Sequence, residues 1–192
     1  MGKNRLEAFS DGVLAIIITI MVLELKVPHD TSWTALQDRW PVFLSYVLSF
    51  IYVGLYWNNH HHFYHAIQRV DGRVLWANLH LLFWLSLIPF VTGWMGENHF
   101  APLPLALYGV VLLMCALAWW LMQQSLLCLP GNRTRLSEAL GKDIKGKISP
   151  LCYLIGIAAA FYWEWLSAAM YVLMALIWLV PDRRIERLLA EK

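Results

Sequence analysis

Six long apolar runs divide the chain, and short polar segments separate them. A helix that crosses a membrane needs roughly 20 apolar residues, and the runs approach or exceed that length. The predicted spans are residues 9–25, 42–64, 74–95, 103–126, 148–162 and 165–180. Only a Trp163-Glu164-Trp165 turn separates the fifth run from the sixth, so these two are expected to form a helical hairpin. The pattern predicts an all-α integral membrane protein with six transmembrane helices in a single unit, residues 1–192.

The composition excludes several classes of protein. Hydrophobic residues make up 59% of the chain, charged residues make up 15%, and the mean hydropathy is +0.53. A soluble domain needs more polar surface than this chain can supply. The net charge of +2 is too small to indicate nucleic-acid binding. The three cysteines are isolated, without the spacing of a metal site, and are expected to be packing residues.

The basic residues are strongly biased to one side of the predicted membrane. If all six runs cross, 13 of the 15 Lys and Arg residues lie on the side that holds both termini. Only Lys26 and Arg39 lie on the other side. Because loops rich in Lys and Arg stay in the cytoplasm, both termini are predicted to be cytoplasmic. The same bias favours an even number of spans.

The first run joins a polar head to an almost wholly apolar helix. At 100° per residue, its apolar residues and one hydroxyl fall on a single stripe. The members of this stripe are Gly12, Ile16, Thr19, Ile20 and Leu23. The stripe either lines something narrow or packs against neighbouring helices, and the sequence pattern alone leaves both open.

Asp11 lies at the mouth of this helix, about 100° away from the stripe. An acid in this position is costly unless it is paired or faces water. The candidate partners are Arg5, Ser10, His60, Asn78 and His80. We expect a polar clasp at the cytoplasmic end of the first helix, and a histidine in it would make the clasp sensitive to pH.

Several positions in the first half of the chain form a family pattern. They are Arg5, Phe9, Ser10, Asp11, Ala15, Ile16 and Thr19 in the first run, Trp57 and His60 in the second, and Asp71, Asn78, Pro89 and Phe90 in the third. The first set resembles the R-x-x-x-F-S-D-x-x-x-A-I-x-x-T signature of the transmembrane protein 175 (TMEM175) family of potassium channels. The other two sets are similar to its W-x-x-H and D…N…P-F elements. The second half resembles the family only in its hydropathy.

The resemblance implies a potassium-permeable channel in a prokaryotic plasma membrane. In this family the first helices line a central pore, and a chain with one six-helix repeat would form a homotetramer. By position, Ile16 would be the hydrophobic constriction, Ile20 and Leu23 would form further apolar rings, and Thr19 would add a ring of hydroxyls. Arg5, Phe9, Ser10 and Asp11 would hold the helix in place. Potassium would be the permeant ion, membrane lipids would be the other partners, and no cofactor is implied.

The absence of a TVGYG-like segment agrees with this implication, because the pore cannot then use a ring of filter carbonyls. Two other functions stay open from the residues. A secondary transporter would use Asp11 as its coupling residue, although the chain lacks an internal repeat. A membrane enzyme would use His61 and His65, which have the i, i+4 spacing of metal ligands. Only one such histidine run occurs, so neither a metal site nor enzymatic activity is expected.

Overall fold

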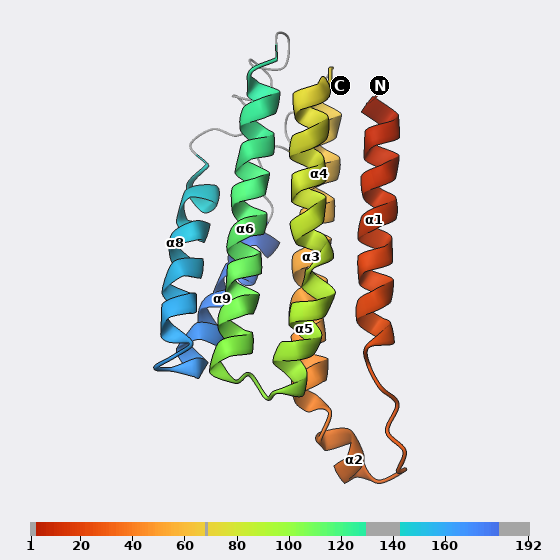
Figure 1. The fold of residues 1–192 in the computed structure, drawn as a ribbon, viewed down its shortest axis with the longest axis vertical. Helices are drawn as coiled ribbons and strands as arrows, with labels where there is room; N and C mark the ends of the chain where they lie inside the picture. The colour runs from red at the N-terminus through yellow and green to blue at the C-terminus, as the bar shows by residue number, and fades with distance from the viewer. Residues whose placement is uncertain (1–2, 68, 130–142, 181–192) are drawn as a thin grey trace.

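The computed structural model describes residues 3–67, 69–129 and 143–180, whose regular elements are all helices. These are α1 (Lys3–Leu23), α2 (Trp33–Gln37), α3 (Trp40–Ala66), α4 (Gly72–Ser86), α5 (Ile88–Glu97), α6 (Pro102–Leu127), α8 (Ile144–Ala159) and α9 (Glu164–Leu179). The long helices run side by side in an elongated bundle, with α2 at one end (Figure 1). The predicted all-α class is confirmed.

Four helical stretches are long and apolar enough to cross a membrane. They are Lys3–Leu23, Trp40–Tyr64, Gly72–Glu97 and Pro102–Leu127, and they overlap the first four predicted spans. The hairpin of α8 and α9 is different, because each helix has 16 residues. At 1.5 Å per residue each is about 24 Å long, which is shorter than the roughly 30 Å hydrocarbon core. A multi-pass membrane fold is therefore shown, while the fifth and sixth crossings stay a prediction.

Prolines and short polar side chains set several helix ends. The Asp71 carboxylate accepts a hydrogen bond from the Val74 N–H at 3.0 Å and so caps the first turn of α4. Pro89 has no N–H to give to the preceding turn, and the predicted third span breaks at Leu87 into α4 and α5. The chain continues from α4 into α5 as one apolar stretch, Gly72–Glu97.

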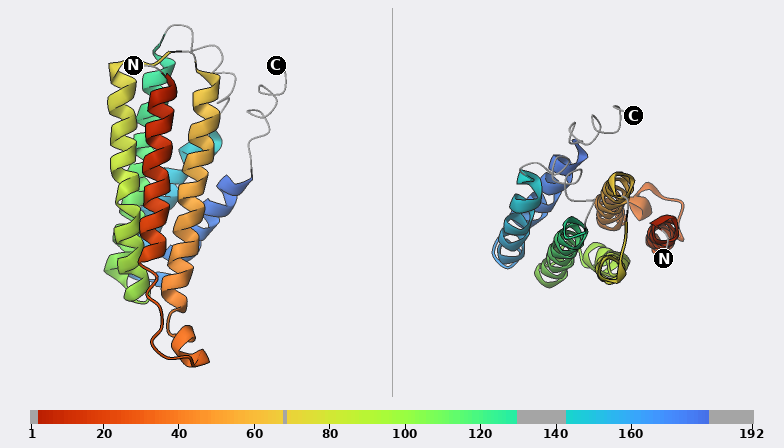
Figure 2. Two further views of the ribbon diagram at one scale, coloured as in Figure 1. Left: turned by 90° about the vertical axis from the view of Figure 1, so that its right-hand side faces the viewer. Right: turned by 90° about the horizontal axis from the view of Figure 1, so that it is seen from above.

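The core of the bundle forms around α6, which contacts α4, α5, α8 and α9. Three buried hydroxyl groups in it bond one another: Ser49 Oγ lies 2.6 Å from Thr92 Oγ1 and 3.0 Å from the Tyr108 hydroxyl. Viewed along the bundle, α1 lies at the edge of the helix group, and α6 lies between α8 and the stretch of α4 and α5 (Figure 2). As a result, α1 has one face against the bundle and one face open.

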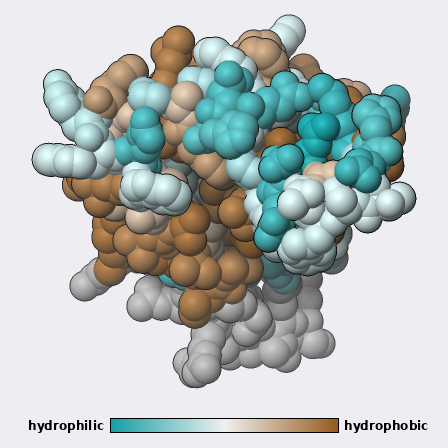
Figure 3. Space-filling model, turned by 90° about the horizontal axis from the view of Figure 1, so that it is seen from below, coloured by the Kyte–Doolittle hydropathy of each residue, from teal (hydrophilic) through white to brown (hydrophobic). Residues whose placement is uncertain are grey.

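The surface is typical of a protein that is in contact with both lipid and water. Seen from the α2 end, hydrophilic and hydrophobic areas lie next to each other (Figure 3). Large apolar side chains such as Phe83, Leu103 and Leu154 are exposed on the sides of the bundle. Contiguous exposed apolar surface of this kind indicates contact with lipid or with other protein.

Candidate functional site

The two faces of α1 differ sharply in burial. The face toward the bundle carries Leu6, Ser10, Leu14, Ile17 and Met21, all buried at helical spacing. The other face carries the predicted stripe, in which Gly12 and Thr19 are exposed. Ile16 is 60% exposed, Ile20 is 43% exposed and Leu23 is 75% exposed. The structure therefore gathers the five stripe residues on a surface that a single chain leaves uncovered.

Three buried polar side chains from three helices bond one another beside the N-terminal half of α1. The Asn78 amide N–H donates to Ser10 Oγ at 2.9 Å, and Asn78 Oδ1 lies 2.9 Å from His60 Nε2. Because the Asn78 oxygen can only accept, His60 donates through Nε2. We call Ser10, His60 and Asn78 the polar anchor. It connects α1, α3 and α4 with directional bonds in a site closed to water.

The polar anchor is completed by neighbouring contacts. Ser10 Oγ donates to the Leu6 carbonyl at 2.9 Å, so the serine both donates and accepts. The Tyr64 hydroxyl reaches Asn78 Oδ1 at 3.5 Å, and its ring stacks on the His60 ring with centroids 4.3 Å apart. His60 Nδ1 has no hydrogen-bond partner among the described residues. Stacking and hydrogen bonding together fix the orientation of the imidazole.

Two further contacts join α1 to α3 side by side. The Trp57 indole N–H donates to Asp11 Oδ1 at 3.1 Å, and His61 Nδ1 lies 3.2 Å from Glu7 Oε1. Each helix contributes two residues spaced four apart, so both contacts repeat over one turn. Asp11 thus faces α3, away from the open stripe, but its partner is Trp57 and none of the five candidates.

The other predicted members of the clasp lie elsewhere. Arg5 is exposed and takes no part in these contacts within the described part of the chain, and Phe9 is 51% exposed. His80 Nε2 accepts a hydrogen bond from the Trp84 indole N–H at 2.9 Å. Asn78 and His80 are two residues apart on α4 and point to nearly opposite sides of it. His80, one of the candidate partners of Asp11, therefore bonds Trp84 on its own helix instead.

The histidine-rich run does not assemble metal ligands in the described ranges. No group of three or more His, Cys, Asp or Glu side chains there is placed to hold a metal ion. His61 is instead next to Glu7, and the side chain of His65 lies outside the described residues.

An ion pair joins the far end of α1 to α5. Lys26 Nζ lies 2.8 Å from Glu97 Oε1, which joins the segment after α1 to the end of α5. The hydrogen bond and the charge of Glu97 raise the pKa of the Lys26 ammonium. Both side chains are well exposed, so this ion pair contributes little to stability.

Comparison with known proteins shows which family the chain resembles. Residues 5–89 match the model of the family described as "Endosomal/lysosomal potassium channel TMEM175". A potassium channel of Chryseobacterium sp. (strain P1-3) is 54% identical over 191 residues, with 100% of both chains covered. The chain belongs to the TMEM175 family. A second relative, a potassium channel of Streptomyces collinus, is 33% identical, with 91% of this chain and 90% of the relative covered.

A solved TMEM175 structure agrees with the fold. It is the crystal structure of a lysosomal potassium-selective channel TMEM175 homolog from Chamaesiphon minutus. The TM-score is 0.81 at 28% identity, and the match covers 93% of this chain and 96% of that one. The similarity therefore extends through α8 and α9, where the sequence pattern resembles the family only in hydropathy.

Sequence reasoning missed two contacts of this TMEM175 chain. Glu7 and Asp11 are four residues apart, and so are Trp57 and His61. On antiparallel helices these two pairs can meet as successive contacts, and that spacing was the available signal. The indole N–H of Trp57 is easily overlooked because tryptophan near a membrane interface already has an explanation.

Proposed function

We propose that this TMEM175 chain is one subunit of a potassium-permeable channel in a prokaryotic plasma membrane. In this proposal four copies assemble so that their α1 helices surround a central pore. Both termini lie in the cytoplasm, α8 and α9 supply the fifth and sixth crossings, and the protein has no catalytic activity and needs no cofactor. The observation that supports it best is the open stripe on α1, in a family whose bacterial relatives are named potassium channels.

The stripe has the chemistry of a hydrophobic constriction. Four copies of Ile16 would offer an ion no ligand, so a narrow ring would exclude water and stop conduction. Ile20 and Leu23 would form further apolar rings toward the outer end. Thr19 would place oxygen atoms between them, and its hydroxyl already donates to the Ala15 carbonyl at 2.8 Å, which leaves its lone pairs free to face outward.

Selectivity would follow from the hydration of the ion. A cation that passes an apolar ring must lose part of its water shell, and potassium loses it more easily than sodium. The proposed pore would therefore favour potassium modestly. Widening of the rings, by tilt or rotation of α1, would admit water and open the channel.

The polar anchor and the Asp11–Trp57 contact would hold the cytoplasmic end of α1 during such a movement. Ser10, His60 and Asn78 are buried and bonded to one another, so separating them would expose unpaired polar groups. The end of α1 that carries Asp11 is then the fixed point. The rival function, a secondary transporter with Asp11 as the coupling residue, would require this carboxylate to exchange partners.

Potassium flux into liposomes under a potassium gradient tests the proposal. The native chain should pass potassium electrogenically without a counter-substrate. Ile16→Asn should raise the leak and reduce the discrimination against sodium, because an amide supplies ligands within the ring. The matched control is Val22→Asn, an exposed aliphatic residue of α1 outside the stripe, which should leave flux near the native value.

Two outcomes would overturn the proposal. Equal flux in native and Ile16→Asn channels would show that Ile16 does not form the constriction. Saturable exchange or flux coupled to protons would instead indicate a transporter. A measurement of the mass of the purified complex complements both, because four chains are expected and a stable monomer would leave the pore without walls.

A further inference from the structure

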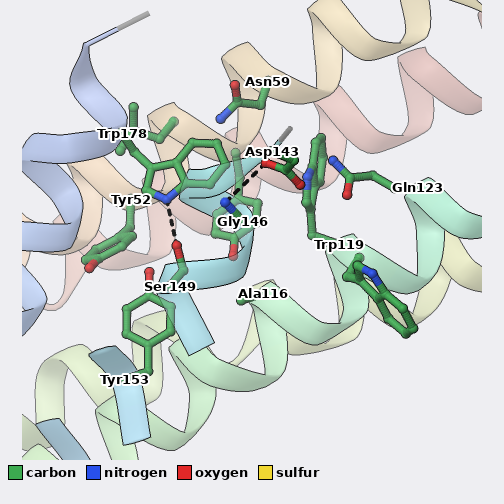
Figure 4. A pocket seen from close by; sticks show the side chains of 13 residues that line it. Tyr52, Asn59, Ala116, Trp119, Gln123, Asp143, Gly146, Ser149, Tyr153 and Trp178 are labelled. Carbon is green, nitrogen blue, oxygen red and sulfur yellow. Dashed lines mark hydrogen bonds between the residues drawn. The ribbon is translucent and has the colours of Figure 1, made fainter. Parts of the chain in front are cut away.

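A pocket opens between α3, α6, α8 and α9, and no residue of α1 lines it (Figure 4). All the space there that no atom fills, open solvent at the mouth included, is about 530 Å³. It lies in the part of the bundle where α8 begins, separate from both the stripe and the polar anchor. Nothing in the proposed channel mechanism uses it.

The walls of the pocket are largely aromatic. Tyr56 comes from α3, Trp119 from α6, Tyr153 from α8 and Trp178 from α9. The Trp178 indole N–H donates to Ser149 Oγ at 2.9 Å, a contact that joins α9 to α8 within the pocket. The aromatic surfaces are therefore held in place by their own helices and do not need a ligand to order them.

One carboxylate gives the pocket its charge. Asp143 is the single charged residue among those lining the pocket, and the close-up shows it between Trp178 and Trp119 (Figure 4). Its Oδ1 accepts the Gly146 N–H at 3.1 Å, and it forms no ion pair with the residues that the structure describes. The nearby Lys145 ammonium is bound to the Val180 carbonyl at 2.6 Å. The pocket thus presents a negative charge that no side-chain cation neutralises in the described ranges.

This combination selects one kind of ligand. An anion would be repelled by the Asp143 carboxylate, and a wholly apolar molecule would leave that carboxylate unpaired beside it. A bare metal ion would find a single carboxylate where it needs several oxygen ligands. A cation with an apolar arm satisfies both parts, because aromatic faces attract organic ammonium groups and also bury hydrocarbon.

We propose that this pocket binds an organic ammonium ion. Its positive nitrogen lies against Asp143 and the indole faces of Trp119 and Trp178, and its apolar arm lies on Tyr56 and Tyr153. The amide side chains of Asn59 and Gln123, which also line the pocket, accept further hydrogen bonds from a primary ammonium. The TMEM175 chain then carries a ligand site that is distinct from its proposed pore.

Calorimetric titration of the full chain with benzyltrimethylammonium tests the site. The protein is held in nanodiscs of phosphatidylglycerol, which carries no ammonium group. Saturable binding is expected for the native chain. Neopentylbenzene, which has carbon in place of the charged nitrogen, should bind about tenfold more weakly or worse, since charge-assisted contacts have that magnitude.

Two variants show whether the probe binds in this pocket or at another site. Asp143→Asn should weaken the affinity for benzyltrimethylammonium about tenfold. It should fold normally, because asparagine caps helices as well as aspartate and tolerates the left-handed backbone found here, with φ of 38°. The matched control is Asp71→Asn, which removes the same charge from the cap of α4 outside the pocket and should bind like the native chain.

The outcomes are distinct. Equal affinity in Asp143→Asn and native protein would overturn the proposal, and so would equal binding of the neutral probe. Adding phosphatidylethanolamine to the nanodiscs identifies the source of the ligand. If phosphatidylethanolamine competes with the probe in the native chain and not in Asp143→Asn, the site is assigned to a lipid headgroup ammonium. If it does not compete, the site is assigned to a soluble ammonium ion.

Discussion

The two halves of α1 are held to the bundle by different chemistry. The N-terminal half makes directional contacts through Glu7, Ser10 and Asp11, which reach α3 and α4 at 2.9 to 3.2 Å. The C-terminal half is held by apolar side chains such as Ile17 and Met21, and beyond its end the described residues contribute the exposed Lys26–Glu97 pair.

This difference indicates where the helix can move. Hydrogen bonds between buried groups fix both distance and angle, and they leave unpaired groups behind when they break. Apolar contacts tolerate small shifts better, because they have no preferred direction. In the proposed channel, the constriction lies in the half that is free to tilt, and the anchor lies in the half that is fixed.

Breaking the polar anchor should have the largest effect. Asn78→Leu leaves buried His60 Nε2 without its acceptor and removes the hydrogen bond that Ser10 Oγ accepts, and should lower the free energy of unfolding by about 2–5 kcal/mol. Thermal unfolding followed by tryptophan fluorescence measures this. Asn58→Leu, on an exposed position of α3, is the control and should change it by less than about 0.5 kcal/mol. Similar stability of the two variants would show that the anchor is dispensable.

Within the apolar half, the buried and open faces should respond differently. Ile17→Ala, at a position 3% exposed, leaves a cavity and should cost about 2–4 kcal/mol of stability. Ile20→Ala, at a position 43% exposed, should cost under about 0.5 kcal/mol but raise potassium flux. Equal loss of stability at both positions, with native flux, would place Ile20 in a packed interface.

The Asp11–Trp57 contact should contribute less than the anchor, since Trp57 is 48% exposed. A double-mutant cycle of Asp11→Asn and Trp57→Phe should give a coupling energy of about 0.5–1 kcal/mol. Combining Asp11→Asn with Trp76→Phe, an exposed tryptophan of α4, should give a coupling near zero. Asp11→Asn alone should also impair assembly or opening. Normal expression, oligomeric mass and flux in that variant would refute a role for the carboxylate.

The Lys26–Glu97 tie should have the smallest effect. The pKa of Lys26 is raised, so the pair is fully present at neutral pH and is lost only as the pH rises through that raised value. Glu97→Gln should therefore lower the melting temperature slightly between pH 6 and about 9, and less at high salt. A large shift that does not depend on salt would mean that Glu97 has another structural role.

The sequence predicts much of this arrangement because hydrophobic runs and signature residues are local signals. The first four spans follow from apolar length. Ser10, His60 and Asn78 were candidates only as partners of Asp11, and in the structure they bond one another. The break at Leu87 was hidden within one apolar run, because Pro89 interrupts hydrogen bonding without interrupting hydrophobicity.

Other features depend on how distant segments meet. The Trp57 partner of Asp11 requires the register of α1 against α3, which hydropathy does not encode. Asp143 lies at the start of α8, in a segment where basic residues suggested only membrane topology. Its position in an aromatic pocket depends on four helices coming together, and no short sequence window contains that information.

Thiol accessibility on α1 tests the pore-lining role most directly. Ile16→Cys is placed in a chain whose Cys115, Cys128 and Cys152 are replaced by alanine, and potassium flux is measured with and without Cd²⁺. Thiolates that converge from facing subunits bind this soft ion, so Cd²⁺ should block flux in Ile16→Cys and leave Val22→Cys unaffected. If Cd²⁺ leaves the flux through Ile16→Cys unchanged, or blocks Val22→Cys equally, the result would contradict a pore lined by this stripe.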